Sequence, residues 1–150
     1  SRRPITKESF EYEDFGNGIV RAPLHTLING MNVFSFAISK PPRSIETFMA
    51  DYRIDRERDV DYFLIHQANK MIVDRIVKKL KLPLEKVPYN LEEFGNLGGA
   101  SIPSLMVTRL RKQLMTEEKS LLMSSFGLGL TWGTMWLRTQ PMVVSELVIL

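Results

Sequence analysis

The sequence predicts an α/β protein in which helices pack on a mixed β-sheet. Short apolar runs typical of buried strands alternate along the chain with stretches whose apolar residues recur at helical spacing. Near the carboxy-terminal end, two strand-like runs follow each other across a short glycine-rich link, which indicates an antiparallel pair. Strands joined through helices, together with one directly joined pair, give a sheet with parallel and antiparallel neighbours.

The composition is that of one domain without disulfides. The 150 residues are 44% hydrophobic, enough for a single core over residues 1–150. Lys and Arg number 20 against 17 Asp and Glu, but the basic residues are scattered, so nucleic-acid binding has little support beyond the overall charge. The sequence shows no apolar run of the roughly 20 residues that a membrane span needs, and it opens without a signal-like apolar segment. We therefore expect a cytoplasmic protein that binds no nucleic acid.

The first third of the chain combines turns with one long helical pattern. "DFGNG" at 14–18 is expected to be a loop, and "NGIVRA" at 17–22 is expected to contain a short strand. Over 31–52 the apolar positions recur at helical spacing, which predicts a helix. Pro41 and Pro42 must kink or split that helix, because proline cannot donate an interior helical hydrogen bond.

The middle of the chain predicts a strand, a helix and another strand. "DYFLIH" at 61–66 is short and apolar, as a buried strand is. Residues 68–80 carry one apolar stripe and predict a helix that ends before Pro83. Three lysines would face away from that stripe: Lys78, Lys79 and Lys81. "VPYNL" at 87–91 is expected to be a second short strand.

The last third predicts one more helix and a strand pair. A glycine-rich loop leads into a helix in which Ser101 supplies the cap and Pro103 lies in the first turn, and the helix should run to about Leu114. Strands are expected at 120–126 and 130–138, and the tail at 141–150 could add another.

Two polar side chains are candidates for chemistry. His66 ends the first central strand, and Asn96 lies in the glycine-rich loop after the second, so both are expected at one edge of the sheet, where ligands gather. A neutral imidazole and a side-chain amide could both donate hydrogen bonds to one oxygen and stabilise negative charge on it. The residues alone leave a second interpretation open, in which His66 is a core residue and the glycines only turn the chain.

Four segments carry a resemblance to a known family. "HQAN" at 66–69, "GNLGGASIP" at 95–103 and "FGLGLTWG" at 126–133, in this order, resemble the carboxy-terminal half of β-ketoacyl-acyl-carrier-protein synthase III. "INGMNVFSFAI" at 28–38 is similar to another segment of that family, which has the thiolase-like fold of condensing enzymes. The fold class implied is an α/β mixed sheet with helices packed on it, as in the carboxy-terminal half of a thiolase-like fold.

The resemblance implies a division of this single domain into three parts. Residues 1–27 would be an entry segment, 28–138 the family-like core and 139–150 a tail. The amino-terminal half, which carries the nucleophile in the family, would lie outside the 150 residues.

The resemblance also implies a reaction and its site. The family performs a decarboxylative Claisen condensation of acyl-CoA with malonyl-carrier-protein in fatty acid or related lipid biosynthesis, with no cofactor and no metal. His66 and Asn96 would hydrogen-bond the malonyl thioester carbonyl as it becomes an enolate. The loop of Gly127, Leu128 and Gly129 would contribute to the hole for the acyl-thioester oxyanion, although Leu128 stands where the family often has glycine.

Other residues take weaker assignments from the resemblance. Asn32, Phe34 and Gly98 would border the substrate channel. Lys70 and Met71 would lie where the acyl carrier protein docks, with Met71 at a position where the family commonly has arginine.

Cysteine is absent, so the nucleophile of the family is missing from these residues. We therefore expect a carboxy-terminal domain of a longer protein or one part of a split enzyme, inactive in isolation and homodimeric when complete. Two histidines without cysteine also disfavour a zinc site. The alternative is a catalytically silent scaffold, or a carrier-docking partner, with the same fold.

Overall fold

The computed structural model describes residues 4–25, 29–127 and 129–148. The chain forms two compact units, Ser1–Val33 and Phe34–Leu150, which we describe separately. The prediction of one domain over residues 1–150 stays a prediction.

The first unit contains a small β-hairpin. A 3₁₀ turn, η1 (Lys7–Phe10), precedes β1 (Glu13–Asp14) and β2 (Val20–Arg21), which pair antiparallel. The turn between the strands has three consecutive residues with positive φ, from Gly16 to Gly18. The loop expected at 14–18 and the short strand expected within 17–22 are thus confirmed.

Two helices take the place of the single helix expected over 31–52. They are α1 (Gly30–Ala37) and α2 (Lys40–Asp51). Pro41 and Pro42 lie in the first turn of α2, where no intrahelical hydrogen bond needs their nitrogens. The split predicted from the two prolines is confirmed.

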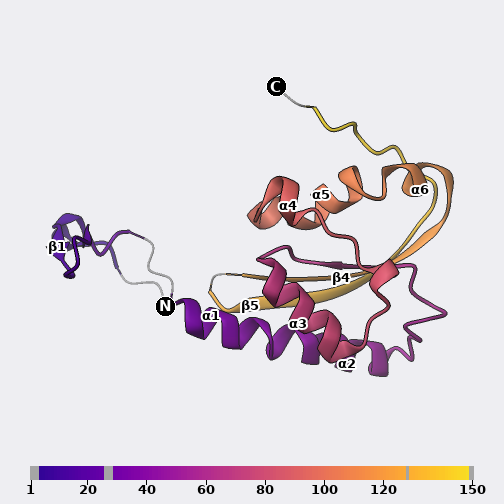
Figure 1. The fold of residues 1–150 in the computed structure, drawn as a ribbon, viewed down its shortest axis with the longest axis horizontal. Helices are drawn as coiled ribbons and strands as arrows, with labels where there is room; N and C mark the ends of the chain where they lie inside the picture. Colours follow the sequence, from indigo (N-terminus) through magenta and orange to yellow (C-terminus); the bar gives the residue numbers. More distant parts are fainter. Residues whose placement is uncertain (1–3, 26–28, 128, 149–150) are drawn as a thin grey trace. The chain divides into compact units, whose positions relative to one another are not determined.

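A three-stranded mixed sheet organises the second unit (Figure 1). Its strands are β3 (Tyr62–Ile65), β4 (Lys119–Gly127) and β5 (Thr131–Thr139), in the order β3-β4-β5. β3 and β4 are parallel, with Ile65 opposite Ser124, and β4 and β5 are antiparallel. The mixed sheet and its carboxy-terminal strand pair are confirmed.

Helices cover both faces of this sheet. Phe63 and Ile65 pack with the apolar faces of α2 and α3, whereas Leu64 packs with α5 and α6 on the other face. Figure 1 shows α2 and α3 below the sheet and the later helices above it. The last three side chains of β3 are at most 1% exposed, which explains why this part of the strand is continuously apolar.

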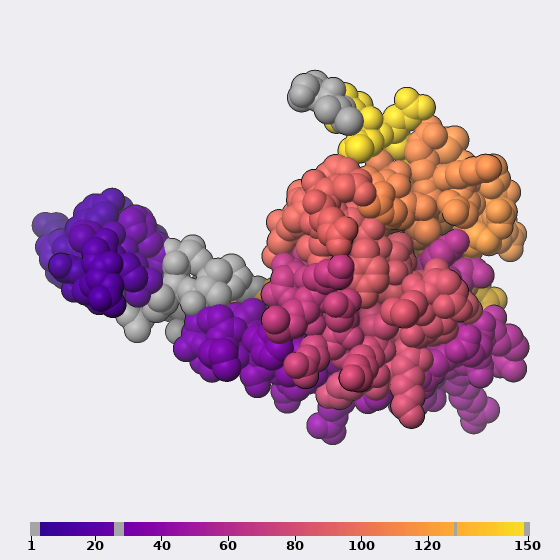
Figure 2. Space-filling model, viewed as in Figure 1, coloured from indigo at the N-terminus to yellow at the C-terminus, as the bar shows by residue number. Residues whose placement is uncertain are grey.

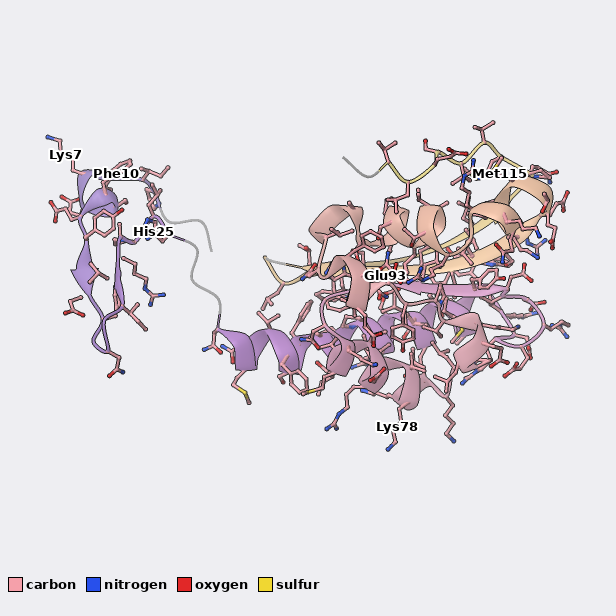
Figure 3. The ribbon with its side chains drawn as sticks, turned by 45° about the horizontal axis from the view of Figure 1, so that its top comes forward. Lys7, Phe10, His25, Lys78, Glu93 and Met115 are labelled. Atoms are coloured by element: carbon pink, nitrogen blue, oxygen red, sulfur yellow. The ribbon has the colours of Figure 1, made fainter. Side chains whose placement is uncertain are left out.

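Helix α3 (Lys70–Leu80) follows β3 closely. It begins two residues later than predicted because Asn69 is its N-cap, with the side-chain Oδ1 accepting the Ile72 N–H at 2.8 Å. The predicted apolar stripe is buried: Ile72, Val73, Ile76, Val77 and Leu80. Lys78 and Lys79 are exposed, and Lys78 projects away from the body of the unit (Figure 3).

The prediction of a strand at 87–91 is wrong. The chain there runs from η2 (Leu84–Lys86) into the short helix α4 (Leu91–Phe94) without pairing with a strand. Side chains engage its backbone instead, since Arg109 Nε donates to the Tyr89 carbonyl at 2.6 Å. An apolar segment whose backbone is bound by side chains does not need a sheet.

The helix expected from Ser101 to Leu114 is two helices. A 3₁₀ turn, η3 (Gly98–Ala100), leads into α5 (Ser101–Thr108), and α6 (Arg111–Thr116) follows. The Thr108 hydroxyl donates back to the Ser104 carbonyl at 2.7 Å, a contact that tends to bend helices. The cap role expected for Ser101 is also wrong: Ala100 is the N-cap, and the Ser101 hydroxyl binds Gln67.

The tail forms no strand over its described residues 141–148, so the strand expected at 141–150 is not found there. Two hydrogen bonds hold its backbone: Met142 N–H donates to the Leu114 carbonyl, and Arg111 Nε donates to the Val144 carbonyl. The Val144 side chain is buried in the core cluster that contains Leu64. Among the described residues, no helix is both long and apolar enough to cross a bilayer.

Candidate functional site

His66 directly follows β3 and continues its pairing by one residue. Its N–H donates to the Ser124 carbonyl at 2.9 Å, and its side chain is buried, with the residue 7% exposed. The imidazole meets the Phe126 ring edge to face, with centroids 5.1 Å apart. Ring atom Nδ1 is buried without a hydrogen-bond partner. The position of His66 is therefore fixed by the end of a core strand.

Burial decides the charge of His66. It lowers the pKa of the imidazole, because the charged form loses its hydration. His66 is thus neutral over a wider pH range than an exposed histidine, and a neutral imidazole has one N–H to donate.

Asn96 lies on an exposed loop between α4 and η3. Its side-chain Oδ1 accepts the Gly98 N–H at 2.9 Å, which closes a local turn. Gly95 and Gly98 have φ of 63° and 56°, in the region that favours glycine. The salmon-coloured stretch around residues 90–100 lies at the surface in Figure 2. Local turn chemistry, and not core packing, shapes this loop.

The structure corrects one step of the sequence argument about these two residues. The loop of Asn96 follows a helix, α4, and not a strand, so the edge of the sheet does not by itself bring Asn96 next to His66. No hydrogen bond joins the two side chains, both of which lie in the described range 29–127. Their convergence on one oxygen stays a prediction.

A contact that the sequence did not indicate connects their segments. Gln67, beside His66, donates its N–H to the Ser101 hydroxyl at 2.6 Å. Gln67 and Ser101 are each 1% exposed. The available signal was the burial expected where the chain leaves a core strand, because a buried backbone N–H there must find an acceptor.

The predicted oxyanion loop is the β4–β5 hairpin. Gly127 is the last residue of β4 and lies opposite Thr131, and Gly129 has φ of 89°. Leu128 lies outside the described residues. The glycine-rich link between two strands is confirmed, and a role in binding an oxyanion stays a prediction.

The predicted channel residues belong to three different elements or units of the chain. Asn32 is exposed in the first turn of α1, and its N–H is bound by Asn29 Oδ1 at 3.0 Å. Phe34 belongs to the second unit, where it is half-buried against the core that α2 and α3 share. Gly98 opens η3, directly after the Asn96 turn.

The predicted docking residues open α3. Lys70 forms an exposed ion pair with Glu92, with Nζ 2.8 Å from Oε1, which raises the pKa of Lys70 and lowers that of Glu92. Met71 is 61% exposed. A shallow hollow of about 450 Å³ lies over this helix face, lined by Lys70, Met71, Asp74, Arg75 and Lys78. One of its cations is thus already paired with a carboxylate.

No three His, Cys, Asp or Glu residues are grouped to hold a metal ion in the part of the chain that the structure describes. The candidate site proposed from the sequence thus rests on two polar side chains, His66 and Asn96, on separate segments.

The fold of the second unit is that of the thiolase-like condensing enzymes. A crystal structure of a 3-oxoacyl-(acyl-carrier protein) synthase from Burkholderia xenovorans matches 80% of this chain and 34% of its own, with a TM-score of 0.76 and 34% identity. A second solved structure, of a 3-oxoacyl-(acyl-carrier-protein) synthase III, matches 89% of this chain and 39% of its own with the same TM-score and 28% identity.

Sequence comparison gives the family. The model of the 3-oxoacyl-[acyl-carrier-protein (ACP)] synthase III C terminal matches residues 55–139. The β-ketoacyl-[acyl-carrier-protein] synthase III of Streptococcus pyogenes is 40% identical over 113 residues, which are 74% of this chain and 35% of the relative. The chain belongs to the synthase III family and corresponds to its C-terminal part. It spans about a third of the length of the curated relatives it matches.

Proposed function

We propose that this chain supplies the malonyl-side hydrogen-bond donors of a decarboxylative Claisen condensation between acyl-CoA and malonyl-carrier-protein. The reaction would serve fatty acid or related lipid biosynthesis. The observation that carries the proposal is His66, a buried imidazole of lowered pKa at the end of a core strand. The names of the relatives support it, since those proteins are β-ketoacyl-[acyl-carrier-protein] synthases III.

The reaction needs a cysteine that these residues do not contain. In an amino-terminal half, that cysteine attacks the acyl-CoA carbonyl, a thioester forms and CoA leaves as the thiol. The carbon–carbon bond to the malonyl carboxylate then breaks, carbon dioxide leaves, and the electron pair forms an enolate. The enolate carbon attacks the acyl thioester, and the cysteine leaves as thiolate. This chain alone would therefore be inactive.

His66 would stabilise the enolate as a neutral donor. A buried N–H without an acceptor costs free energy, and Nδ1 is buried without a partner, so the single proton of the neutral ring belongs on Nε2. An Nε2–H can then donate to the thioester oxygen as negative charge develops on it. The lowered pKa serves this role because it keeps the ring from ionising near neutral pH.

Asn96 would donate to the same oxygen. Its Oδ1 already accepts the Gly98 N–H, so the side chain presents its Nδ2 hydrogens to another acceptor. Two preorganised donors on one developing oxyanion are an effective form of catalysis, because they need no reorganisation as the charge forms.

The remaining roles follow the same proposal. The hairpin of Gly127, Leu128 and Gly129 would help to bind the acyl-thioester oxyanion, and Asn32, Phe34 and Gly98 would border the channel. The Lys70–Met71 end of α3 would meet the acyl carrier protein. The partners would be the amino-terminal half and the carrier protein, in a homodimer when complete, and no cofactor would be needed beyond the two substrates.

The test compares the wild type with Asn96→Ala. The chain is expressed with the coding region upstream of it and is given labelled acyl-CoA and malonyl-carrier-protein. We expect Asn96→Ala to lower condensation by roughly a hundredfold to a thousandfold, the usual effect of removing one oxyanion donor, while cysteine acylation survives. Leu97→Ala, at the neighbouring exposed position, should change neither step.

Condensation that survives in Asn96→Ala would refute the role of this residue. If the complete wild-type protein shows no acylation and no condensation with acyl donors of any chain length, that result would favour the catalytically silent scaffold of the same fold.

A further inference from the structure

A buried polar network joins the segment of His66 to the start of α5. Its members are Gln67, Asn90, Ser101, Ser104 and Thr108. The first three are at most 2% exposed, and Ser104 and Thr108 are half-buried. Hydrogen bonds pair the donors of Gln67 and Asn90 with neighbouring acceptors, whereas Asn90 Oδ1 is buried without a partner.

Gln67 is held from two sides. Its N–H donates to the Ser101 hydroxyl at 2.6 Å, and its side-chain Nε2 donates to the Ile65 carbonyl at 2.8 Å. Ile65 is the last residue of β3, so the two bonds tie the end of the strand to the first residue of α5. His66 is the residue between Ile65 and Gln67, so hydrogen bonds hold the residue on each side of it.

Ser101 is connected to Asn96 by a short, internally bonded stretch. Asn96 Oδ1 binds the Gly98 N–H, and the Ala100 N–H donates to the Leu97 carbonyl at 3.1 Å. The stretch has no buried residue before Ser101, so nothing in the core holds it until that serine. The Gln67–Ser101 bond is the one hydrogen bond between residues 66–69 and 95–101, all of which are described.

We propose that Ser101 is a positioning residue, whose hydroxyl sets the placement of Asn96 relative to His66 by accepting the Gln67 N–H. This inference rests on the proposed function, in which both side chains must donate to one oxygen. Ser101 itself touches no substrate. Its importance follows from geometry, because a displacement of about 1 Å in a donor can cost roughly a hundredfold in rate.

Ser104 offers a matched control. Its hydroxyl accepts a hydrogen bond from Asn90 Nδ2 at 2.9 Å and donates to the Ser101 carbonyl at 2.7 Å. It belongs to the same network and the same helix, but makes no bond to residues 66–69. Ser104→Ala therefore removes a comparable hydroxyl and leaves the Gln67–Ser101 bond in place.

The experiment measures condensation by the complete protein with Ser101→Ala, Ser104→Ala and Ser101→Thr, at a temperature where thermal melting shows each to be folded. We expect Ser101→Ala to lower kcat roughly tenfold to a hundredfold, with KM for malonyl-carrier-protein and cysteine acylation unchanged. Ser104→Ala should keep kcat near the wild-type value, and Ser101→Thr, which retains the hydroxyl, should recover most of it. Should Ser101→Ala not fold, Ser101→Cys keeps most of the volume with a weaker acceptor and should show the same loss.

Hydrogen exchange gives a readout that does not depend on activity. The Gln67 amide should exchange faster in Ser101→Ala than in Ser104→Ala, because only the first change removes its acceptor. Equal losses of kcat in the two variants, or an unchanged Gln67 amide, would overturn the positioning role.

Asn96→Ala, assayed in parallel, separates the two proposals. Condensation lost in Asn96→Ala but kept in Ser101→Ala refutes the positioning role alone. Condensation kept in Asn96→Ala refutes the proposed function of the site, and with it the reason for positioning.

Discussion

The segment of His66 and the loop of Asn96 differ in what holds them. β3 is buried on both faces, and His66 extends it by one residue. The loop from Gly95 to Ala100 is exposed throughout and is shaped by glycine conformations and one side-chain turn. One candidate donor is therefore placed by the core of the domain, whereas the other depends on a local turn and on one buried residue, Ser101.

The largest difference should appear in stability. Phe63→Ala removes a ring with no exposure from the core next to His66, and should lower the free energy of unfolding by about 3–5 kcal/mol. Leu97→Ala, in the Asn96 loop at 40% exposure, should change it by no more than about 0.5 kcal/mol. Urea denaturation of the two variants measures both values. Similar losses would mean that the loop is packed more firmly than its exposure indicates.

Two asparagines make the same kind of hydrogen bond in the two regions. Asn69 Oδ1 accepts the Ile72 N–H at the start of α3, and Asn96 Oδ1 accepts the Gly98 N–H in the loop. Asn69→Ala removes a helix cap and should cost about 1 kcal/mol. Asn96→Ala should cost only a few tenths, because its turn is exposed to water that can replace the bond. Urea denaturation of both variants measures the two losses in the free energy of unfolding. A larger loss in Asn96→Ala than in Asn69→Ala would show that the Asn96 turn contributes more to stability than the helix cap.

The smallest effect concerns pH. Burial lowers the folded-state pKa of His66, so the unfolded chain binds a proton more readily than the folded one. Stability from this group is fully present above the unfolded pKa of about 6.5 and is lost as pH falls from there toward the lowered folded pKa. We expect the melting temperature of the wild type to fall as pH is lowered through this window. The melting temperature of His66→Asn should fall less over the same pH range. Identical pH profiles would show that His66 is not desolvated in solution.

Local patterns predicted the elements with strong periodicity. The strand at 62–65, the helix at 70–80 and the strand pair at 119–127 and 131–139 all lie where the sequence placed them, within a few residues. These segments carry buried apolar faces of unambiguous period, and each ends at a turn signal.

The two expected strands that did not form share one physical cause. The segments at 87–91 and 141–148 are apolar enough for strands, yet a strand needs a neighbouring backbone to pair with. Arginine side chains bind their carbonyls instead, Arg109 that of Tyr89 and Arg111 that of Val144. Sequence periodicity carries no record of which distant side chain will reach a carbonyl.

Local sequence patterns are enough to identify the candidate residues. They place His66 at a strand end and Asn96 between glycines, because strand ends and glycine turns are encoded by neighbouring residues. The burial that lowers the pKa of His66, and the bond from Gln67 to Ser101, 34 residues away, could not be predicted from these patterns. Both depend on how distant segments pack, and packing is settled by the free energy of the whole core rather than by any local pattern.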